Sequence, residues 1–308
     1  MRRLSILGCG NAVPENYVMF GEEKRYRMTE GQNLLELCEV AINRALEDAG
    51  LTMDDIDCII GGMATPLQPI PCNAALIHER MAKGRDIPAM DINTTCTSFL
   101  SALDVAAYMT DYGKYDKILI VSGDTASGAL NPKQKESYEL FSDAAAAFIV
   151  GASEESGIIS SAQKTWSEGA HDTEIRGGGG LLTAFKFNEE TKDNYYFDMK
   201  GPKVLKLSAR KLPDFLNESL DKAGINLDDV KLVIPHQASK ALDLIMPRLG
   251  IKEGKYINRV SEYGNMISAS IPYTLCDVIH EGGISRGDIV ILMGTAAGLT
   301  SNILILKY

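Results

Sequence analysis

Three residues that could take part in nucleophilic catalysis stand at expected turns, and the first of them is a cysteine. Cys96 lies in AMDINTTCTSFLSALDVAAYM, where a strand is expected to end near Asn93 and a helix to run from Phe99 to Met109. The sulfur would then lie near a helix N-terminus, where the positive end of the helix dipole favours the thiolate that a nucleophile needs. The alternative from this local context is a buried structural cysteine.

His236 and Asn265 supply polar groups that could act with such a nucleophile. His236 follows the apolar run Leu232–Pro235, at the carboxyl end of an expected buried strand, where ligand groups gather in open α/β sheets. Asn265 follows the turn signature Tyr263-Gly264 and precedes an expected helix, so the alternative for it is a helix N-cap. A cysteine with a distant His and Asn is a recognised nucleophile arrangement.

The elements that must position these residues occur twice in the chain. Residues 49–66 (AGLTMDDIDCIIGGMATP) resemble residues 223–239, and residues 115–124 (YDKILIVSGD) resemble residues 287–296, in the same order and at similar offsets. This predicts a duplicated unit of about half the chain, with chance similarity of αβ units as the alternative. The glycine run 177–180 is expected to be a surface loop between the halves.

Within each half, strand and helix patterns alternate. Ile118–Val121 and Ile289–Met293 are apolar at every position, which predicts mainly parallel sheets buried on both faces. Leu34–Leu46 and Leu212–Ala223 show helical apolar periodicity. Two such halves, packed through shared helices, predict an α/β fold of five layers, αβαβα.

Composition restricts the class of protein. The 308 residues are 45% hydrophobic and 23% charged, with a net charge of −10 and a pI near 5.0. This is a normal globular composition for roughly two domains, and the acidic total argues against nucleic-acid binding. No apolar run approaches the roughly 20 residues of a membrane span. The six cysteines show no CxxC or zinc spacing, which predicts reduced thiols and a cytoplasmic location.

Several longer motifs resemble, in order, the ketoacyl-acyl-carrier-protein synthase III family of the thiolase superfamily, over nearly the whole chain. The motifs are Asp91–Cys96, Leu140–Ala147, Met199–Val204, Pro235–Ala238, Tyr263–Pro272 and Gly294–Thr300. The resemblance implies a thiolase fold of two pseudo-duplicated halves. Residues 1–160 would carry the nucleophile, and residues 161–308 would carry the His and Asn.

The resemblance also implies a mechanism. Cys96 would take an acyl group from a thioester, and the N–H groups of Cys96 and Ala297 would form an oxyanion hole. His236 and Asn265 would hold the carbonyl of a malonyl thioester and stabilise the enolate formed as carbon dioxide leaves. The substrates would be coenzyme A or carrier-protein thioesters, with no metal and no bound cofactor. Asn265 in place of a second histidine resembles the initiating synthases.

Further residues match the family's pocket and its docking surface. Phe141 and Met199 would line the acyl pocket, and Ile70 would reach into the partner subunit of a homodimer; the alternative for all three is core packing. A basic surface would bind an acyl carrier protein, with ordinary solvated side chains as the alternative. It comprises Lys203, Lys206, Arg210 and Lys240.

The chain departs from the family between Asn16 and Arg25. The family carries there a segment whose tryptophan stacks on the adenine of coenzyme A, whereas the one tryptophan of this chain is Trp166. Lys135 stands where the family has an arginine partner of that adenine. A carrier-protein donor is therefore at least as expected as coenzyme A, in fatty-acid initiation or in a specialised fatty-acid or polyketide pathway.

Two other functions fit the same residues. One is an acyltransferase that passes the Cys96 acyl group to an oxygen or nitrogen nucleophile without condensation. The other is a non-catalytic partner of an active synthase.

Overall fold

The first half of the chain builds one five-stranded sheet. The computed structural model describes residues 1–308, and this sheet has the order β2-β8-β7-β5-β6. Its strands are β2 (Ser5–Ala12), β5 (Cys58–Gly61), β6 (Ala89–Asp91), β7 (Lys117–Asp124) and β8 (Ala144–Gly151). β5 pairs in parallel with β6 and β7, whereas β8 runs antiparallel to β7 and β2. The prediction of mainly parallel sheets is thus wrong: an all-apolar run reports burial on both faces, which a central antiparallel strand shares.

The second half repeats this arrangement. Its sheet has the order β1-β9-β14-β13-β12, with an isolated parallel bridge from Val233 to Tyr256 where the first sheet has β6. β12 and β13 are parallel, and β13–β14 and β14–β9 are antiparallel, as in the first sheet. The strands are β1 (Arg2–Arg3), β9 (Gly157–Thr165), β12 (Leu232–Pro235), β13 (Ile289–Ala296) and β14 (Thr300–Lys307). The repeated order fits the duplication expected from the sequence.

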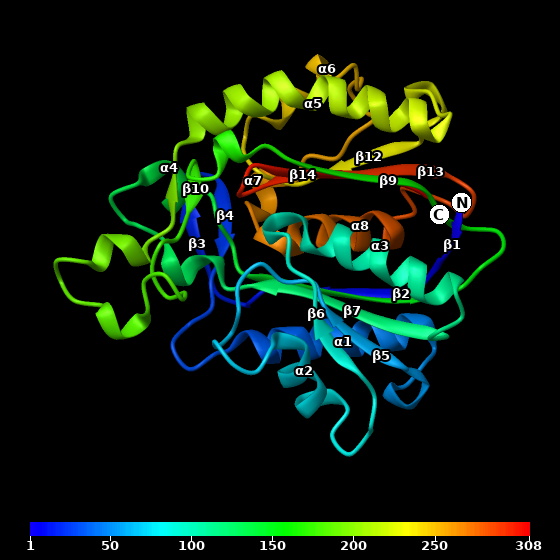
Figure 1. The fold of residues 1–308 in the computed structure, drawn as a ribbon, viewed down its shortest axis with the longest axis horizontal. Coiled ribbons are helices and arrows are strands. Elements are labelled where there is room, and N and C mark those ends of the chain that lie inside the picture. The colour runs from blue at the N-terminus through cyan, green and yellow to red at the C-terminus, as the bar shows by residue number, and fades with distance from the viewer.

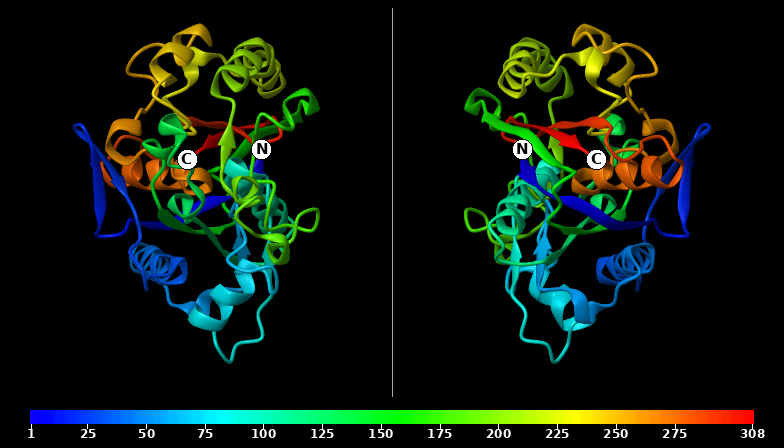
Figure 2. Two further views of the ribbon diagram at one scale, coloured as in Figure 1. Left: turned by 90° about the vertical axis from the view of Figure 1, so that its left-hand side faces the viewer. Right: turned by 90° about the vertical axis from the view of Figure 1, so that its right-hand side faces the viewer.

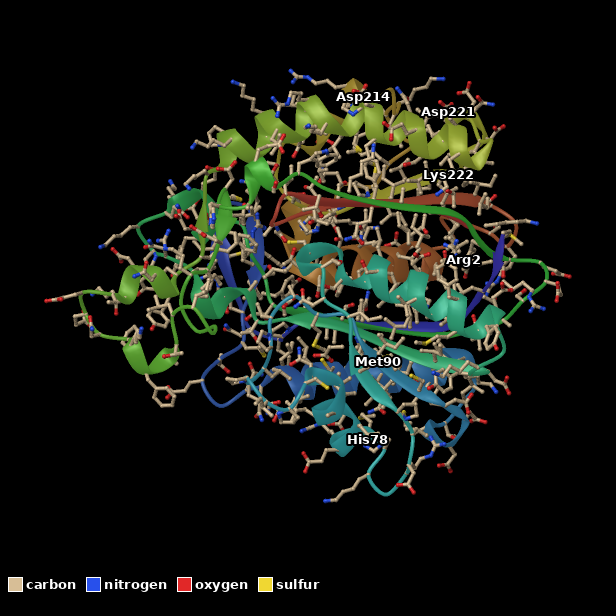
Figure 3. The ribbon with its side chains drawn as sticks, in the orientation of Figure 1. Arg2, His78, Met90, Asp214, Asp221 and Lys222 are labelled. Carbon is tan, nitrogen blue, oxygen red and sulfur yellow. The ribbon has the colours of Figure 1, made fainter.

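Helices cover both sheets and separate them, which gives the five layers αβαβα (Figure 1). The central layer holds α3 (Ser98–Asp111) and α8 (Ser270–His280), and the outer layers hold α1 (Leu34–Ala49) with α2 (Asn73–Met81), and α5 (Gly201–Ala223) with α6 (Leu242–Arg248). Asp214, Asp221 and Lys222 of α5 lie at one outer surface, and His78 of α2 lies toward the other (Figure 3). α5 begins well before the expected Leu212. No helix could cross a membrane, given the length and apolarity that this requires.

Smaller elements gather at one end of the layers, opposite the chain termini (Figure 1). They are the hairpin β3 (Tyr17–Phe20) and β4 (Glu23–Tyr26), the pair β10 (Thr173–Glu174) and β11 (Asp198–Met199), and the short helices α4 (Lys135–Tyr138) and α7 (Val260–Tyr263). The hairpin projects from the side of the molecule (Figure 2). The glycine run 177–180 lies between β10 and β11, so it belongs to the second half rather than between the halves.

The chain passes between the sheets at two neighbouring points. β1 belongs to the second sheet and β2 to the first, with Leu4 fully buried between them. β8 and β9 also belong to different sheets, and Ser156 between them exchanges hydrogen bonds with Leu4: its carbonyl accepts from Leu4 N–H at 3.2 Å and its hydroxyl donates to the Leu4 carbonyl at 3.0 Å. The expected boundary at 160/161 falls inside β9, so we propose to divide the halves at residues 152–156 instead.

Candidate active site

Cys96 lies at a sharp turn between β6 and α3. Thr95, Cys96 and Thr97 form a single 3₁₀ turn that leads into α3, and Thr95 has a φ of 52°. A β-branched residue rarely adopts this left-handed conformation, which costs on the order of 1–3 kcal/mol. The Asn93 side chain holds the turn, because its Oδ1 accepts the Thr95 N–H at 2.8 Å and its Nδ2 donates to the Ala64 carbonyl at 2.8 Å.

Asn265 occupies the equivalent turn of the second half. Its Oδ1 accepts the N–H of Ile267, whose φ is 50°, at 2.8 Å. This bond directs the Nδ2 donor away from the turn, toward the Ala238 carbonyl, which is a long 3.4 Å away. Asn265 is thus the counterpart of Asn93, with an amide donor that is held less tightly. In the same comparison, Ser268 is the counterpart of Cys96.

The first half of the chain fixes the backbone of Asn265. Its N–H donates to the Leu140 carbonyl at 2.9 Å, and its carbonyl accepts the Ser142 N–H at 2.9 Å. Gly264 precedes it with a φ of 70°, and a Cβ there would lie 2.2 Å from the Leu140 carbonyl oxygen. Only glycine allows this close approach. The Leu140–Ala147 motif and the Tyr263–Pro272 motif therefore meet at the site.

His236 lies directly after β12 and is buried. Its N–H donates to the Met293 carbonyl at 2.8 Å, which fixes its backbone beside β13. A Cβ at Gly294 would lie 2.8 Å from the His236 Cβ and 3.2 Å from the Thr97 Cγ2. Gly294 therefore leaves the space in which His236 packs near the Cys96 turn. The Nδ1 atom of His236 has no hydrogen-bond partner in the protein.

Burial keeps both reactive groups neutral near pH 7. It raises the pKa of the Cys96 thiol to about 12, and the Asp124 carboxylate raises this pKa further, whereas the N–H groups of Ala297 and Cys96, which reach the sulfur, lower it. Burial also lowers the pKa of His236 to about 4. The thiolate expected from the helix N-terminus is therefore not the resting form, because loss of hydration outweighs these donors.

Asp124 at the end of β7 connects the site to both halves. Its buried carboxylate accepts the Thr65 N–H at 2.9 Å and hydroxyl at 2.7 Å, and the Ser268 N–H at 3.1 Å and hydroxyl at 2.5 Å. It thereby holds the turn that precedes α8 against the first sheet. Sequence reasoning missed Asp124 and Asn93; the repeat was the available signal, because Asn93 occupies the position of Asn265.

Cys96, His236 and Asn265 line one cavity of about 300 Å³. Phe141, Met199 and the backbone region of Ala297 also belong to its wall, which is mostly apolar. Glu174 is the one charged side chain of the wall, and its carboxylate pairs with His171 at 2.9 Å and Arg176 at 3.1 Å. Ile70 lies outside this cavity and is 84% exposed.

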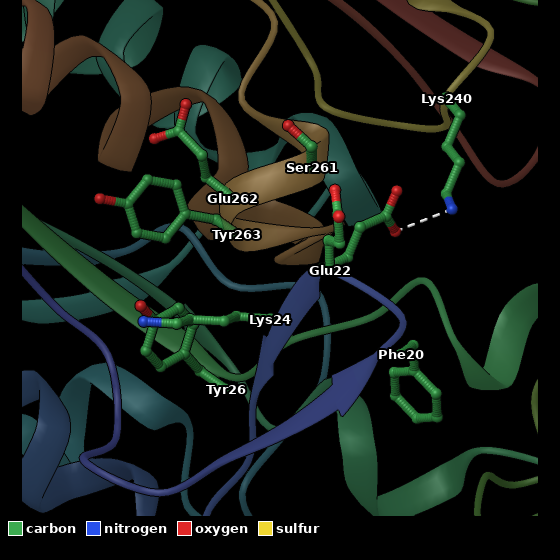
Figure 4. Close-up of a pocket in the computed structure, with 9 residues that line it drawn as sticks. Phe20, Glu22, Lys24, Tyr26, Lys240, Ser261, Glu262 and Tyr263 are labelled. Carbon is green, nitrogen blue, oxygen red and sulfur yellow. Dashed lines mark ion pairs between the residues drawn. The ribbon is translucent and has the colours of Figure 1, made fainter.

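A second hollow, of about 730 Å³, lies beside the hairpin of β3 and β4 (Figure 4). Phe20, Glu22 and Lys24 of the hairpin region face Glu262 and Tyr263 of α7 across it. Lys240 also lines it, and its Nζ pairs with Glu23 Oε2 at 2.7 Å. Trp166 is elsewhere, with its ring against that of Phe215 in α5 at a centroid distance of 5.8 Å.

The remaining basic residues differ in whether they form ion pairs. Lys203 and Lys206, in the first turns of α5, are exposed and form no ion pair. Arg210 is paired with Glu168 at 3.2 Å. Lys135 begins α4 with an 83% exposed side chain and lies 3.8 Å from Glu139. Of the expected docking residues, Arg210 and Lys240 therefore already have acidic partners.

Comparison of the sequence with known protein families assigns both halves of the chain to one family. Residues 90–167 match the family "3-Oxoacyl-[acyl-carrier-protein (ACP)] synthase III", and residues 220–308 match its C-terminal counterpart. The chain is 33% identical to the beta-ketoacyl-[acyl-carrier-protein] synthase III of Clostridium perfringens, over 93% of this chain and 88% of the relative.

Solved structures show the same fold. The 3-oxoacyl-[acyl-carrier-protein] synthase III of Aquifex aeolicus superimposes with a TM-score of 0.88 at 26% identity, over 99% of this chain and 100% of the other. OleA of Xanthomonas campestris, at 17% identity and a TM-score of 0.85 over 100% and 98% of the two chains, shows the fold alone.

The layers, the repeated turns and the cavity thus define a condensing enzyme with the thiolase fold. This chain belongs to the beta-ketoacyl-[acyl-carrier-protein] synthase III family.

Proposed function

We propose that the protein extends an acyl group by two carbons through a covalent intermediate on Cys96. A nucleophile, a neutral imidazole and an amide donor share one cavity, and this observation carries the proposal. The cavity is lined mainly by apolar side chains, which suits an aliphatic acyl chain. Phe141 and Met199 are the side chains that we assign to its acyl-binding wall.

The first half-reaction transfers the acyl group. The Cys96 sulfur attacks the thioester carbonyl, and the new C–S bond replaces the bond to the donor thiol, which leaves with the proton that Cys96 gives up. The N–H groups of Cys96 and Ala297 stabilise the negative oxygen of the tetrahedral intermediate, since they already lie within reach of the sulfur. Acylation also removes the need for a buried thiolate, because the sulfur becomes a neutral thioester.

The second half-reaction forms the carbon–carbon bond. His236 and Asn265 donate hydrogen bonds to the carbonyl of a malonyl thioester, so that the enolate left by departing carbon dioxide is stabilised. The enolate carbon attacks the carbonyl carbon of the Cys96 thioester, the C–S bond breaks, and the released Cys96 thiolate takes a proton from solvent. A neutral histidine suits this role. Its N–H can donate a hydrogen bond to the enolate oxygen, but it is too weak an acid to protonate the enolate carbon.

The test measures the intact mass of the protein and the carbon dioxide released from a malonyl thioester. The native protein, given an acyl thioester, should show one adduct by intact-mass analysis, and Cys96→Ala should show none. The acylated native protein should then release carbon dioxide from a malonyl thioester in proportion to product. An adduct on Cys96→Ala would overturn the nucleophile; acylation without carbon dioxide release, with transfer to an alcohol or amine, would overturn condensation.

For the donor, we propose an acyl carrier protein rather than coenzyme A. The chain has no tryptophan near the hairpin, and stacking on a base is worth about 1–3 kcal/mol. Lys203 and Lys206 offer unpaired positive charge on α5 for an acidic partner, while Arg210 and Lys240 would first have to leave Glu168 and Glu23. Lys135 stays a prediction as a nucleotide contact. The pathway would be fatty-acid initiation or a specialised fatty-acid or polyketide pathway.

Charge reversal at one end of α5 tests this donor. Lys206→Glu should slow Cys96 acylation from the carrier protein and leave acylation from coenzyme A unchanged. Lys222→Glu, at the far end of the same helix, is the matched control and should change neither. Equal effects of the two variants on the carrier-protein reaction would contradict docking at Lys206.

We also propose a homodimer. Ile70 is almost fully exposed, and β6 is an edge strand with a partner on one side only. Pairing of two β6 edges would extend the sheet across a twofold axis and carry Ile70 toward the neighbour's cavity. Sedimentation at micromolar concentration should show a dimer; the presence of a 33.5 kDa species alone would contradict it.

The cytoplasmic location predicted from the six cysteines stays a prediction.

A further inference from the structure

A cluster of metal-binding side chains lies outside the acyl-transfer cavity. Cys9 of β2 and Cys276 of α8 are buried, and His280 stands one helical turn after Cys276 on the same face of α8. One imidazole nitrogen and both sulfurs lie within 4.8 Å of one another. Individual distances are 3.7 Å from Cys9 Sγ to His280 Nε2 and 3.8 Å from Cys276 Sγ to His280 Nδ1.

Asp48 of α1 lies beside this cluster, outside the group of atoms that are within 4.8 Å of one another. Its Oδ2 lies 3.4 Å from His280 Nε2 and accepts the Cys9 N–H at 2.8 Å. In a tetrahedral zinc site, with zinc–sulfur bonds of about 2.3 Å and zinc–nitrogen or –oxygen bonds of about 2.0–2.2 Å, neighbouring ligand atoms lie about 3.4–3.8 Å apart. The distances from His280 Nε2 to Cys9 Sγ and to Asp48 Oδ2 fall in this range.

The cluster is also reachable from solvent. Asp48 and His280 line an open hollow of about 390 Å³, whose other lining residues are Gly10, Asn11, Arg44 and Glu47. The two sulfurs lie behind these residues, because β2 is packed between α8 and α1 (Figure 1). An ion entering from the hollow would meet the carboxylate and imidazole first and the sulfurs last.

We propose that Cys9, Cys276 and His280 bind one Zn²⁺ ion as a structural site, with the Asp48 carboxylate turning inward as the fourth ligand. Two sulfurs and an imidazole select zinc over magnesium or calcium, which prefer oxygen ligands. Both thiols release their protons to solvent on binding, and the two thiolates balance the charge of the ion. Four protein ligands leave no open position for a substrate, which is the pattern of a structural rather than a catalytic zinc.

The position of the site suggests what it would stabilise. Its ligands come from three elements, β2, α1 and α8, that belong to three adjacent layers. α8 starts directly after the Asn265 turn and ends at His280. A bound ion would therefore fix the far end of the helix that positions Asn265, without touching the acyl-transfer cavity.

The test titrates Co²⁺, and then Zn²⁺, into the reduced protein with Cys96→Ala as the background, so that Cys96 and His236 cannot act as a second pair of Co²⁺ ligands. One Co²⁺ per chain should bind with thiolate-to-cobalt charge-transfer absorption, and Zn²⁺ should displace it and raise the melting temperature. His280→Ala, a change at an exposed position, should weaken binding by more than about 100-fold. Cys276→Ser should abolish the charge-transfer band.

Cys72→Ser is the matched control, because it removes an exposed thiol away from the cluster and should leave binding unchanged. Charge-transfer absorption that His280→Ala leaves intact would overturn the assignment, as would absence of stoichiometric Co²⁺ binding. A mass lower by two hydrogens after mild oxidation, together with no Co²⁺ binding by the reduced protein, would identify Cys9 and Cys276 as a redox pair instead.

Discussion

Replacing Gly294 by alanine should disable the second half-reaction while the protein stays folded. The added Cβ would lie 2.8 Å from the Cβ of His236, 0.6 Å short of the 3.4 Å at which ordinary contact begins. Thr97 Cγ2 at 3.2 Å and Ile271 Cδ1 at 3.3 Å close off the other directions. Because β13 is held between β12 and β14, the strand cannot move back, and His236 must shift from its native position.

The two consequences differ in size. Overpacking of this kind costs about 1–3 kcal/mol of stability. A displacement of about 1 Å in a catalytic group can cost about 10²-fold in rate, so a shift of about half that should lower malonyl decarboxylation by roughly 10–100-fold. Cys96 acylation should fall by less than about tenfold, because the Thr97 contact, at 3.2 Å, is looser than the His236 contact.

The assay measures decarboxylation, Cys96 acylation and urea denaturation of Gly294→Ala beside Gly128→Ala. A Cβ at Gly128 has only Thr125 Cγ2 near it, at 3.7 Å, so this control should behave like the native protein. Native decarboxylation by Gly294→Ala would refute the reasoning. Equal losses in acylation and decarboxylation would show that the strain falls on Cys96 rather than on His236.

Three further predictions rest on other parts of the site. His236→Ala and Asn265→Ala should each lower malonyl decarboxylation by about 10²–10³-fold and spare Cys96 acylation; normal carbon dioxide release by both would contradict their role. Alkylation of Cys96 by iodoacetamide should rise about tenfold per pH unit between about pH 7 and 9, since the thiolate reacts and its pKa is raised; a plateau near neutral pH would indicate a preformed thiolate. Ser268→Ala should lower the free energy of unfolding by about 1–3 kcal/mol, because the buried Asp124 carboxylate loses a 2.5 Å donor; an unchanged urea midpoint would contradict this.

The sequence predicted the parts of the site that depend on local pattern. Cys96 at a strand-to-helix turn and His236 after a buried strand were both readable from apolar runs that end at polar residues. The five layers followed from the repeat and from the family resemblance. The direction of the strands could not be predicted from the sequence, because central strands of either orientation are buried on both faces.

What the sequence could not supply was the result of bringing distant segments together. The raised pKa of Cys96 depends on its burial in the folded chain, which outweighs the N–H donors of Ala297 and Cys96. The ion pairs of Lys240 with Glu23 and of Arg210 with Glu168 join residues far apart in the chain. Likewise, Cys9 and Cys276 are too far apart in the sequence to match a zinc-binding motif. They become neighbours only because β2 packs against α8.

The crossing of the chain at Leu4 bears on how the protein unfolds. Two duplicated halves with separate sheets would ordinarily be able to melt one at a time. Here the first strand of the chain belongs to the second sheet, and Arg2 reaches Asp104 of α3 in the shared central layer. Losing either sheet would therefore strip partners from the other, which couples the two halves into one cooperative unit. The catalytic residues are divided between those halves. Because the halves unfold together, no state with one half folded holds only part of the active site.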